Sequence, residues 1–399
     1  MEWLPATAAE NGIVDMTDAE RLPVMFRHFA EQEFRTSPCY ERLALFLADQ
    51  PALARPLLAA PRRQQRAILY FAAVQYLLRT SAAGHPLAGY LPVLGGARTP
   101  DEGLIAAFTD LVTAYGTELT ALCATRFVQT NEAGRAALLR PGFGRAAELV
   151  QGRPLALVEL GTSAGLLLLP DRYAYRYTAP DGSRTHRTGR VDAPLPLVLE
   201  CEVRGRGWPE PAMVPITLAD RAGIDVCPVD ATDRDAVAWL RSCVWPEHVD
   251  RLDRLDAALV EAAAIQPRLV PGDMVAELPS LLSTVDSCVV PCVFASNALT
   301  YLPREATGRL VDLLAEQGAA RDLVVVLNES SRFGAELLLG RRPAEAGPPG
   351  VLAVGLLTLV AWRNGRATVE VLARTGPHGQ WVEWVPQEYG FTPLSRSTA

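Results

Sequence analysis

The spacing of hydrophobic residues changes about 150 residues into the chain. Up to that point apolar residues recur every three or four positions, which is the period of an amphipathic helix. Helices are expected after the capping box Thr17-x-x-Glu20, after Pro38, from Pro61 to about Arg79, and from Thr99-Pro100 to about Arg126. The sequence therefore predicts an all-helical N-terminal domain over residues 1–150, and we expect this domain to cover the substrate.

Beyond residue 150, short buried strands alternate with helices, which is typical of a mostly parallel sheet. The expected strands are Leu155–Leu160, Arg221–Asp225, Arg268–Asp273, Cys288–Ala295 and Asp322–Glu329. An irregular segment at about 173–210 predicts a β-hairpin insertion, and Asn364-Gly365 predicts a closing hairpin. The fold class expected for residues 151–399 is therefore α/β, with a Rossmann-like seven-stranded sheet. Pro291 predicts a bulge or another irregularity in its strand, because proline removes a ladder donor.

The composition gives no reason to expect nucleic acid or a membrane as a partner. The chain has 399 residues, of which 49% are hydrophobic and 21% charged, and its net charge of −7 gives no reason to expect nucleic acid. The longest apolar run, Val351–Trp362, is too short to span a membrane and indicates a strand. The N-terminal Met1-Glu-Trp-Leu-Pro5 lacks the features of a signal peptide, so a cytoplasmic location is the expectation.

The cysteine and lysine contents limit the classes of reaction and of metal site that the chain can support. Seven scattered cysteines indicate reduced thiols, and Cys288 and Cys292 are expected to be core residues rather than metal ligands. All 38 basic residues are arginine. A Schiff-base lysine and a P-loop lysine are both excluded, and with them pyridoxal phosphate chemistry.

The turn Gly161-Thr-Ser-Ala-Gly165 fits two different chemistries. It matches G-x-S-x-G, a nucleophile elbow in which Ser163 would act with His378 and with Asp225 or Asp273. A hydrolase elbow, however, follows earlier strands and an oxyanion loop, and here the preceding residues are helical. This reading therefore stays as the alternative.

A cofactor loop explains more of the residues. Ligands bind at the carboxyl ends of parallel strands, and Glu159, Asp225 and Asp273 each stand at the end of an expected strand. Gly161 and Gly165 would let the backbone approach a ligand, and the N-terminus of a following helix would offer free N–H groups. An acid after the second strand can bind ribose hydroxyls, and an acid after the third can bind an adenine amino group.

Four motifs carry a resemblance to a known family. They are Val158-Glu-Leu-Gly-Thr-Ser-Ala-Gly165, Gly223-Ile-Asp-Val-Cys-Pro228, Gly272-Asp273 and Ser296-Asn-Ala-Leu-Thr-Tyr-Leu302. In this order they resemble the motifs of class I S-adenosylmethionine-dependent methyltransferases. The whole chain, including Thr130-Asn-Glu-x-Gly-Arg135, also resembles an actinobacterial family of unknown function. Ser163 departs from the usual middle glycine of the loop.

The resemblance implies a methyltransferase that uses S-adenosylmethionine and acts on a small molecule. The residues it implies for cofactor binding are Glu159, Gly161, Thr162, Ser163, Gly165, Asp225, Asp273 and Ser296, with Asp230 as a rival to Asp225. We expect Tyr40, Asn131 and Asn297 to bind the substrate, and His85, Glu132 and Tyr301 are the candidates for catalysis. Aminocarboxypropyl transfer, cyclisation of the cofactor, and a non-catalytic cofactor-binding protein remain as alternatives on the same fold.

Overall fold

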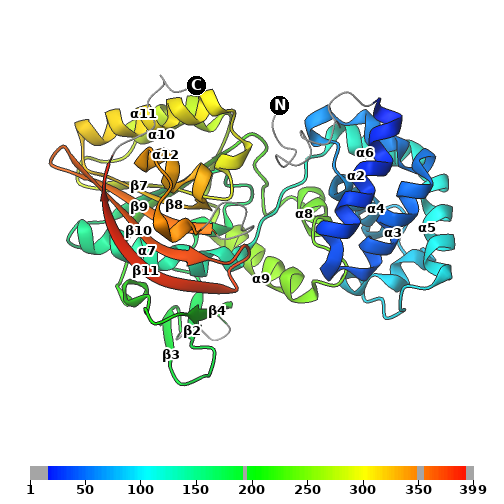
Figure 1. Cartoon of the computed structure of the whole chain (residues 1–399), viewed down its shortest axis with the longest axis horizontal. Coiled ribbons are helices and arrows are strands. Elements are labelled where there is room, and N and C mark those ends of the chain that lie inside the picture. The colour runs from blue at the N-terminus through cyan, green and yellow to red at the C-terminus, as the bar shows by residue number, and fades with distance from the viewer. Residues whose placement is uncertain (1–16, 192–195, 348–354, 392–399) are drawn as a thin grey trace. The chain divides into compact units, whose positions relative to one another are not determined.

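The computed structural model describes residues 17–191, 196–347 and 355–391, and the chain forms two compact units (Figure 1). A helical unit consists of residues 1–130 and 232–255, and a sheet unit of residues 131–231 and 256–399. One boundary between the two units lies between Thr130 and Asn131. Residues 232–255 belong to the helical unit although they lie between two strands of the sheet unit in the sequence. Residues 1–5 and 351–354, discussed above, lie outside the described residues.

The helical unit contains α2 (Asp18–Gln32), α3 (Pro38–Asp49), α4 (Ala67–Arg79), α5 (Glu102–Ala114), α6 (Gly116–Thr125), α8 (Arg234–Ser242) and the start of α9 (Val249–Ile265). The predicted capping box is confirmed: the Thr17 side chain accepts from the Glu20 N–H, and Glu20 bonds back to Thr17. The expected single helix to Arg126 is two helices with a break at Tyr115, and Asp101 rather than Thr99 caps the first of them.

Aromatic rings fill the core of the helical unit. Phe26, Phe34 and Phe71 are fully buried, and their centroids lie 5.6 to 6.0 Å apart where Phe71 meets the other two. The Tyr40 ring stacks on Phe71 with a centroid separation of 4.5 Å. Edge and stacked contacts of this kind add to the burial of apolar area, so these rings fix the relative positions of α2, α3 and α4.

The sheet unit contains β1 (Leu155–Leu160), β2 (Ala174–Thr178), β3 (Thr185–Gly189), β4 (Val198–Arg204), β5 (Leu218–Asp225), β6 (Arg268–Pro271), β7 (Val290–Ser296), β8 (Leu323–Ser330), β9 (Gly355–Arg363), β10 (Arg366–Thr375) and β11 (Trp381–Gly390). They form one mostly parallel sheet in the order β3-β2-β4-β11-β10-β9-β8-β7-β1-β5-β6. The expectation of seven strands is therefore wrong.

The count is higher because β11 has two neighbours. It pairs with β10 on one side and with β4 on the other, where Trp381 lies opposite Glu202. This pairing joins β2, β3 and β4, expected as a hairpin insertion, to the main sheet, with β2 antiparallel to β3 and parallel to β4. The bulge expected at Pro291 is also absent: β7 pairs with β1 through Pro291 without a shift of register, and pairing with β8 begins at Cys292.

Helices cover both faces of the sheet (Figure 1). One face carries α10 (Met274–Ser283), α11 (Arg304–Ala320) and α12 (Ala335–Leu339), and the other carries α7 (Ala136–Leu149). Because strand side chains alternate between faces, Val325 joins the core under α10 to α12 while Val326 meets Gly142 of α7. The carboxyl ends of the parallel strands β1, β5, β6, β7 and β8 thus meet along one edge.

Candidate functional site

Backbone amides of the loop after β1 form hydrogen bonds within the sheet unit. Gly161, Ser163 and Gly165 all have positive φ angles, of 77°, 49° and 71°. The N–H groups of Gly161 and Thr162 donate to the Ile224 carbonyl at 2.8 and 3.2 Å, and the Gly165 N–H donates to the Thr162 carbonyl at 2.8 Å. These amides hold the loop against β5.

The helix expected after this loop is not present. Only one 3₁₀ turn, Leu166–Leu168, follows Gly165, and the chain then passes Pro170 and enters β2. Pro170 cannot donate a backbone hydrogen bond, which opposes continuation of a helix through this point. The loop is therefore followed by a three-residue turn and not by the helix whose N-terminal N–H groups were expected to face a ligand.

Packing within the sheet unit requires both glycines of the loop. A Cβ atom on Gly161 would lie 2.5 Å from the Ala298 Cβ, and a Cβ on Gly165 would lie 2.9 Å from the Pro267 Cγ. Both residues also have positive φ angles. The fold itself therefore requires glycine at both positions, apart from any contact with a ligand.

Asp225 links three strand ends. Its Oδ2 accepts a hydrogen bond from the Ser163 N–H at 2.8 Å, and its Oδ1 accepts one from the Cys227 N–H at 2.9 Å. Its backbone carbonyl accepts from the Gly272 N–H, just after β6, at 2.9 Å. The half-buried carboxylate therefore stands between the β1 loop and the β5 loop. Each oxygen has further lone-pair capacity beyond these bonds.

Asp273, at the end of β6, caps helix α10. Its Oδ1 accepts from the N–H groups of Val275 and Ala276 at 2.9 and 3.0 Å. The side chain is exposed, and both of these bonds use the same oxygen. Asp225 and Asp273, the two acids considered for a Ser163 hydrolase, are thus both engaged with backbone amides.

Glu159 is buried beneath the loop. Its Oε2 accepts a hydrogen bond from the Thr162 hydroxyl at 2.8 Å. Burial raises the pKa of this carboxyl well above its ordinary value, and the charge of Asp225 raises it further, while the Thr162 bond and the Arg135 charge act in the opposite direction. Glu159 therefore holds the Thr162 side chain in place through this hydrogen bond.

A second polar cluster lies at the ends of β7 and β8, and two of its members, Asn328 and Glu329, were not among the predicted site residues. The buried Glu329 accepts hydrogen bonds on a single oxygen, Oε1, from the N–H groups of Ala298 and Leu299 at 2.7 and 3.1 Å. Burial raises its pKa to about 7, although these two bonds and the Arg135 charge lower it. The nearly buried Arg135 donates to the Pro377 carbonyl at 3.1 Å and to the Ser296 carbonyl at 3.4 Å.

Asn328 connects this cluster to its neighbours. Its Nδ2 donates to the Ser296 Oγ at 3.0 Å, and its Oδ1 accepts from the Thr375 hydroxyl at 2.7 Å. Its carbonyl accepts from the N–H of Asn297, which has a φ of 53°. Like Glu159 and Asp225, Asn328 and Glu329 stand at the end of a buried strand, and this position is visible in the sequence.

The remaining candidates of the sheet unit lie around this cluster. Tyr301 is 62% exposed, in a short 3₁₀ turn, Leu299–Tyr301. Glu132 is buried, and its carboxylate accepts from the Gly134 N–H at 3.0 Å. Asn131 is half-buried, and among the described residues its Nδ2 has no hydrogen-bond partner.

Tyr40 and His85 belong to the helical unit and have contacts there. Tyr40 is buried and its hydroxyl accepts from Gln75 at 3.0 Å. The Nδ1 of His85 accepts from the Leu87 N–H, and its Nε2 lies 3.1 Å from Asp110. These contacts position local structure in that unit.

Comparisons with known proteins give one family. One solved structure with similarity is the CcbJ methyltransferase from Streptomyces caelestis, at 12% identity and a TM-score of 0.18, over 63% of this chain and 78% of that one. A search of curated proteins finds no match. Within the described ranges we find no helical segment with the length and apolar character needed to span a bilayer. Residues 24–384 match the family described as "Uncharacterized protein conserved in bacteria (DUF2332)", and the chain therefore belongs to that bacterial family.

Proposed function

We propose that the sheet unit binds S-adenosylmethionine at the carboxyl ends of β1, β5 and β6, and that the protein is a methyltransferase acting on a small molecule. The observation that carries the proposal is the position of Asp225. Its carboxylate lies at the end of β5, bonded to the β1 loop through the Ser163 N–H, with lone pairs left for two ribose hydroxyls.

The other residues take roles consistent with their contacts. Asp273 would bind the adenine amino group, since its helix cap uses Oδ1 alone. Glu159 would act through Thr162 rather than on the cofactor directly. Asn297 and the exposed Tyr301, at the end of β7, would face the acceptor. The sulfonium of the bound cofactor supplies an activated methyl group, and the protein aligns the acceptor with it.

The test is equilibrium binding of S-adenosylmethionine and S-adenosylhomocysteine to the full chain and to Asp225→Ala. We expect the variant to bind both ligands at least about tenfold more weakly, because charge-assisted hydrogen bonds to ribose are lost. The matched control is Asp220→Ala, at the opposite end of the same strand, which should leave the affinity unchanged. Absence of binding to the unaltered chain would refute the proposal.

Product analysis separates the related chemistries. S-adenosylhomocysteine as product supports methyl transfer, whereas methylthioadenosine indicates aminocarboxypropyl transfer or cyclisation. Binding without turnover indicates a non-catalytic protein. Covalent labelling of Ser163 by a fluorophosphonate would instead support the hydrolase.

A further inference from the structure

Glu329 is a buried acid to which the proposed function gives no role. It is the last buried residue of β8 and is 1% exposed. Its Oε1 accepts the hydrogen bonds from the N–H groups of Ala298 and Leu299, and no group of the described part of the chain is bonded to Oε2. The backbone therefore holds one oxygen of the carboxyl group in place, and the other oxygen can gain or lose a proton without breaking these bonds.

Ala298 connects Glu329 to the loop after β1. Its N–H donates to Glu329, and its side chain packs on Gly161, where an added Cβ would lie 2.5 Å from the Ala298 Cβ. Gly161 belongs to the loop at which S-adenosylmethionine is proposed to bind. One residue thus touches both the buried carboxyl group and the proposed cofactor loop.

Arg135 is the charged side chain that acts on Glu329. Its charge lowers the pKa of Glu329, whereas burial raises this pKa to about 7. Leu356 lies opposite Glu329 in β9, and Glu336 of α12 is paired with Arg342 at 2.8 Å. Near neutral pH, Glu329 of the folded protein therefore retains its proton in a large fraction of the molecules.

The proposed cofactor and its product differ in charge. S-adenosylmethionine carries a positive sulfonium, and transfer of the methyl group leaves the neutral thioether of S-adenosylhomocysteine. A positive charge close to a buried carboxyl group favours the ionised form of that group. By linkage, the ionised carboxylate binds the charged ligand more tightly by the same free energy.

We propose that Glu329 distinguishes the cofactor from its product: it releases its proton to solvent when S-adenosylmethionine binds and keeps the proton when S-adenosylhomocysteine binds. This inference rests on the proposed function. After methyl transfer the carboxyl group takes up a proton again, and the electrostatic contribution to binding is lost. Exchange of the product for new cofactor is then favoured.

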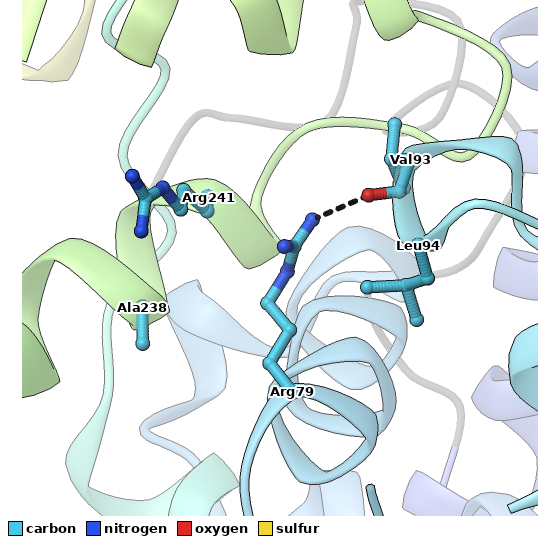
Figure 2. Close-up of a pocket in the computed structure, with 5 residues that line it drawn as sticks. All are labelled: Arg79, Val93, Leu94, Ala238 and Arg241. Atoms are coloured by element: carbon cyan, nitrogen blue, oxygen red, sulfur yellow. Dashed lines mark hydrogen bonds between the residues drawn. The ribbon is translucent and has the colours of Figure 1, made fainter. Parts of the chain in front are cut away.

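Other charged groups have a different chemistry or can be tested separately. In the helical unit, Arg79 and Arg241 line an open depression, where the Arg79 Nη2 lies 3.4 Å from the Val93 carbonyl (Figure 2). Arginine keeps its proton throughout the neutral range, so neither can be the source of a released proton. His378 is a residue type that titrates near neutral pH, and its carbonyl lies against Gly134. The variant His378→Gln therefore serves as a control.

The test is calorimetric titration of the full chain with both ligands at about pH 6.5, in two buffers of different ionisation enthalpy. The difference between the buffers gives the number of protons released. We expect S-adenosylmethionine to release roughly half a proton or more, and S-adenosylhomocysteine to release almost none. Glu329→Gln keeps an acceptor for both amides, so it should abolish the release and leave the affinity for S-adenosylhomocysteine unchanged. His378→Gln should release as many protons as the unaltered chain does.

The pH dependence of affinity gives a second measurement. From about pH 6 to about pH 7, the affinity for S-adenosylmethionine relative to S-adenosylhomocysteine should rise several-fold in the unaltered chain, with roughly tenfold as the limit for one proton. The same ratio should stay level in Glu329→Gln. Titration of the ligands themselves contributes equally to both proteins and cancels in this comparison.

The outcomes separate this inference from the proposed function. If neither ligand binds to the unaltered chain, both are refuted. If both ligands bind and release equal numbers of protons, the inference alone is overturned, and this comparison does not depend on the folding of any variant. Proton release that persists in Glu329→Gln would assign the titration to another group, such as Glu159, and would also overturn it.

Discussion

At the residue scale, Glu329 makes stability depend on pH. Its pKa rises from 4.5 to about 7 because the carboxyl is buried. Between these values the unfolded chain has released the proton and the folded protein retains it, so stability falls as pH rises from about 4.5 to about 7. The shift corresponds to about 3 kcal/mol when the transition is complete.

The variant Glu329→Gln isolates this effect. Both backbone bonds end on one oxygen, Oε1, so a glutamine carbonyl can accept them while the titration is lost. Urea unfolding at a series of pH values should show that the unaltered chain loses stability relative to Glu329→Gln as pH rises through this window. Glu159, whose pKa is also raised, is present in both proteins. Parallel pH profiles would contradict the prediction.

At the element scale, the loop between β1 and the following 3₁₀ turn is held by contact with the β7 loop. Gly161→Ala places a Cβ 2.5 Å from the Ala298 Cβ at a φ of 77°, so both the contact and the backbone oppose it. We expect a loss of roughly 2–4 kcal/mol in the free energy of unfolding. Gly152→Ala has a similar φ of 73° and nothing within 4 Å, so it should cost only about 1 kcal/mol.

A rescue variant locates the cause. Ala298→Gly in the Gly161→Ala background removes the opposing Cβ and should recover the part of the loss that exceeds the Gly152→Ala value. Denaturant unfolding of the unaltered chain, Gly161→Ala, Gly152→Ala and the double variant Gly161→Ala/Ala298→Gly measures this recovery of stability. If the two glycine variants lose equal stability, the loop is not packed against Ala298 in solution.

At the scale of the whole molecule, α8 lies in the sequence between β5 and β6 but belongs to the helical unit. Its residues Val237, Trp239 and Leu240 are buried, and the Trp239 indole donates to the Phe127 carbonyl at 2.8 Å. A fragment that begins at Asn131 therefore leaves the apolar face of α8 without its partners. We expect this fragment to bind a hydrophobic dye strongly and to aggregate.

The matched control is the same fragment with residues 232–255 replaced by a Gly/Ser linker of equal length. The sheet unit retains its own core in this control, so dye binding should fall and the far-ultraviolet circular dichroism should still show strands. Equal dye binding by the two fragments would mean that the exposed apolar surface lies elsewhere.

Local patterns in the sequence predicted much of the fold. The capping box at Thr17 formed as expected, and Asn364-Gly365 makes the turn between β9 and β10 with φ angles of 50° and 74°. Strand ends at Glu159, Asp225 and Asp273 also lie close to their expected places. These features depend on residues a few positions apart, so their physical causes are contained in short segments.

Contacts between distant segments decided the rest. Pairing of β11 with β4 converted an expected insertion into part of an eleven-stranded sheet. Arg135 contacts the carbonyls of Ser296 and Pro377, far along the chain, so no local pattern indicated its place beside Glu329. The order of the strands places the acids at one edge of the sheet. The close packing of Gly161 against Ala298 shows that the fold itself requires this glycine.

By itself, the sequence determined the helical and strand segments and the polar residues at the strand ends, because hydrophobic period and capping chemistry act locally. Only the tertiary structure decided which strands are neighbours and which acids are buried and raised in pKa. The physical reason is that burial, strand register and electrostatic environment depend on contacts between groups far apart in the sequence. Such contacts form only when the chain folds, so patterns among neighbouring residues do not reveal them.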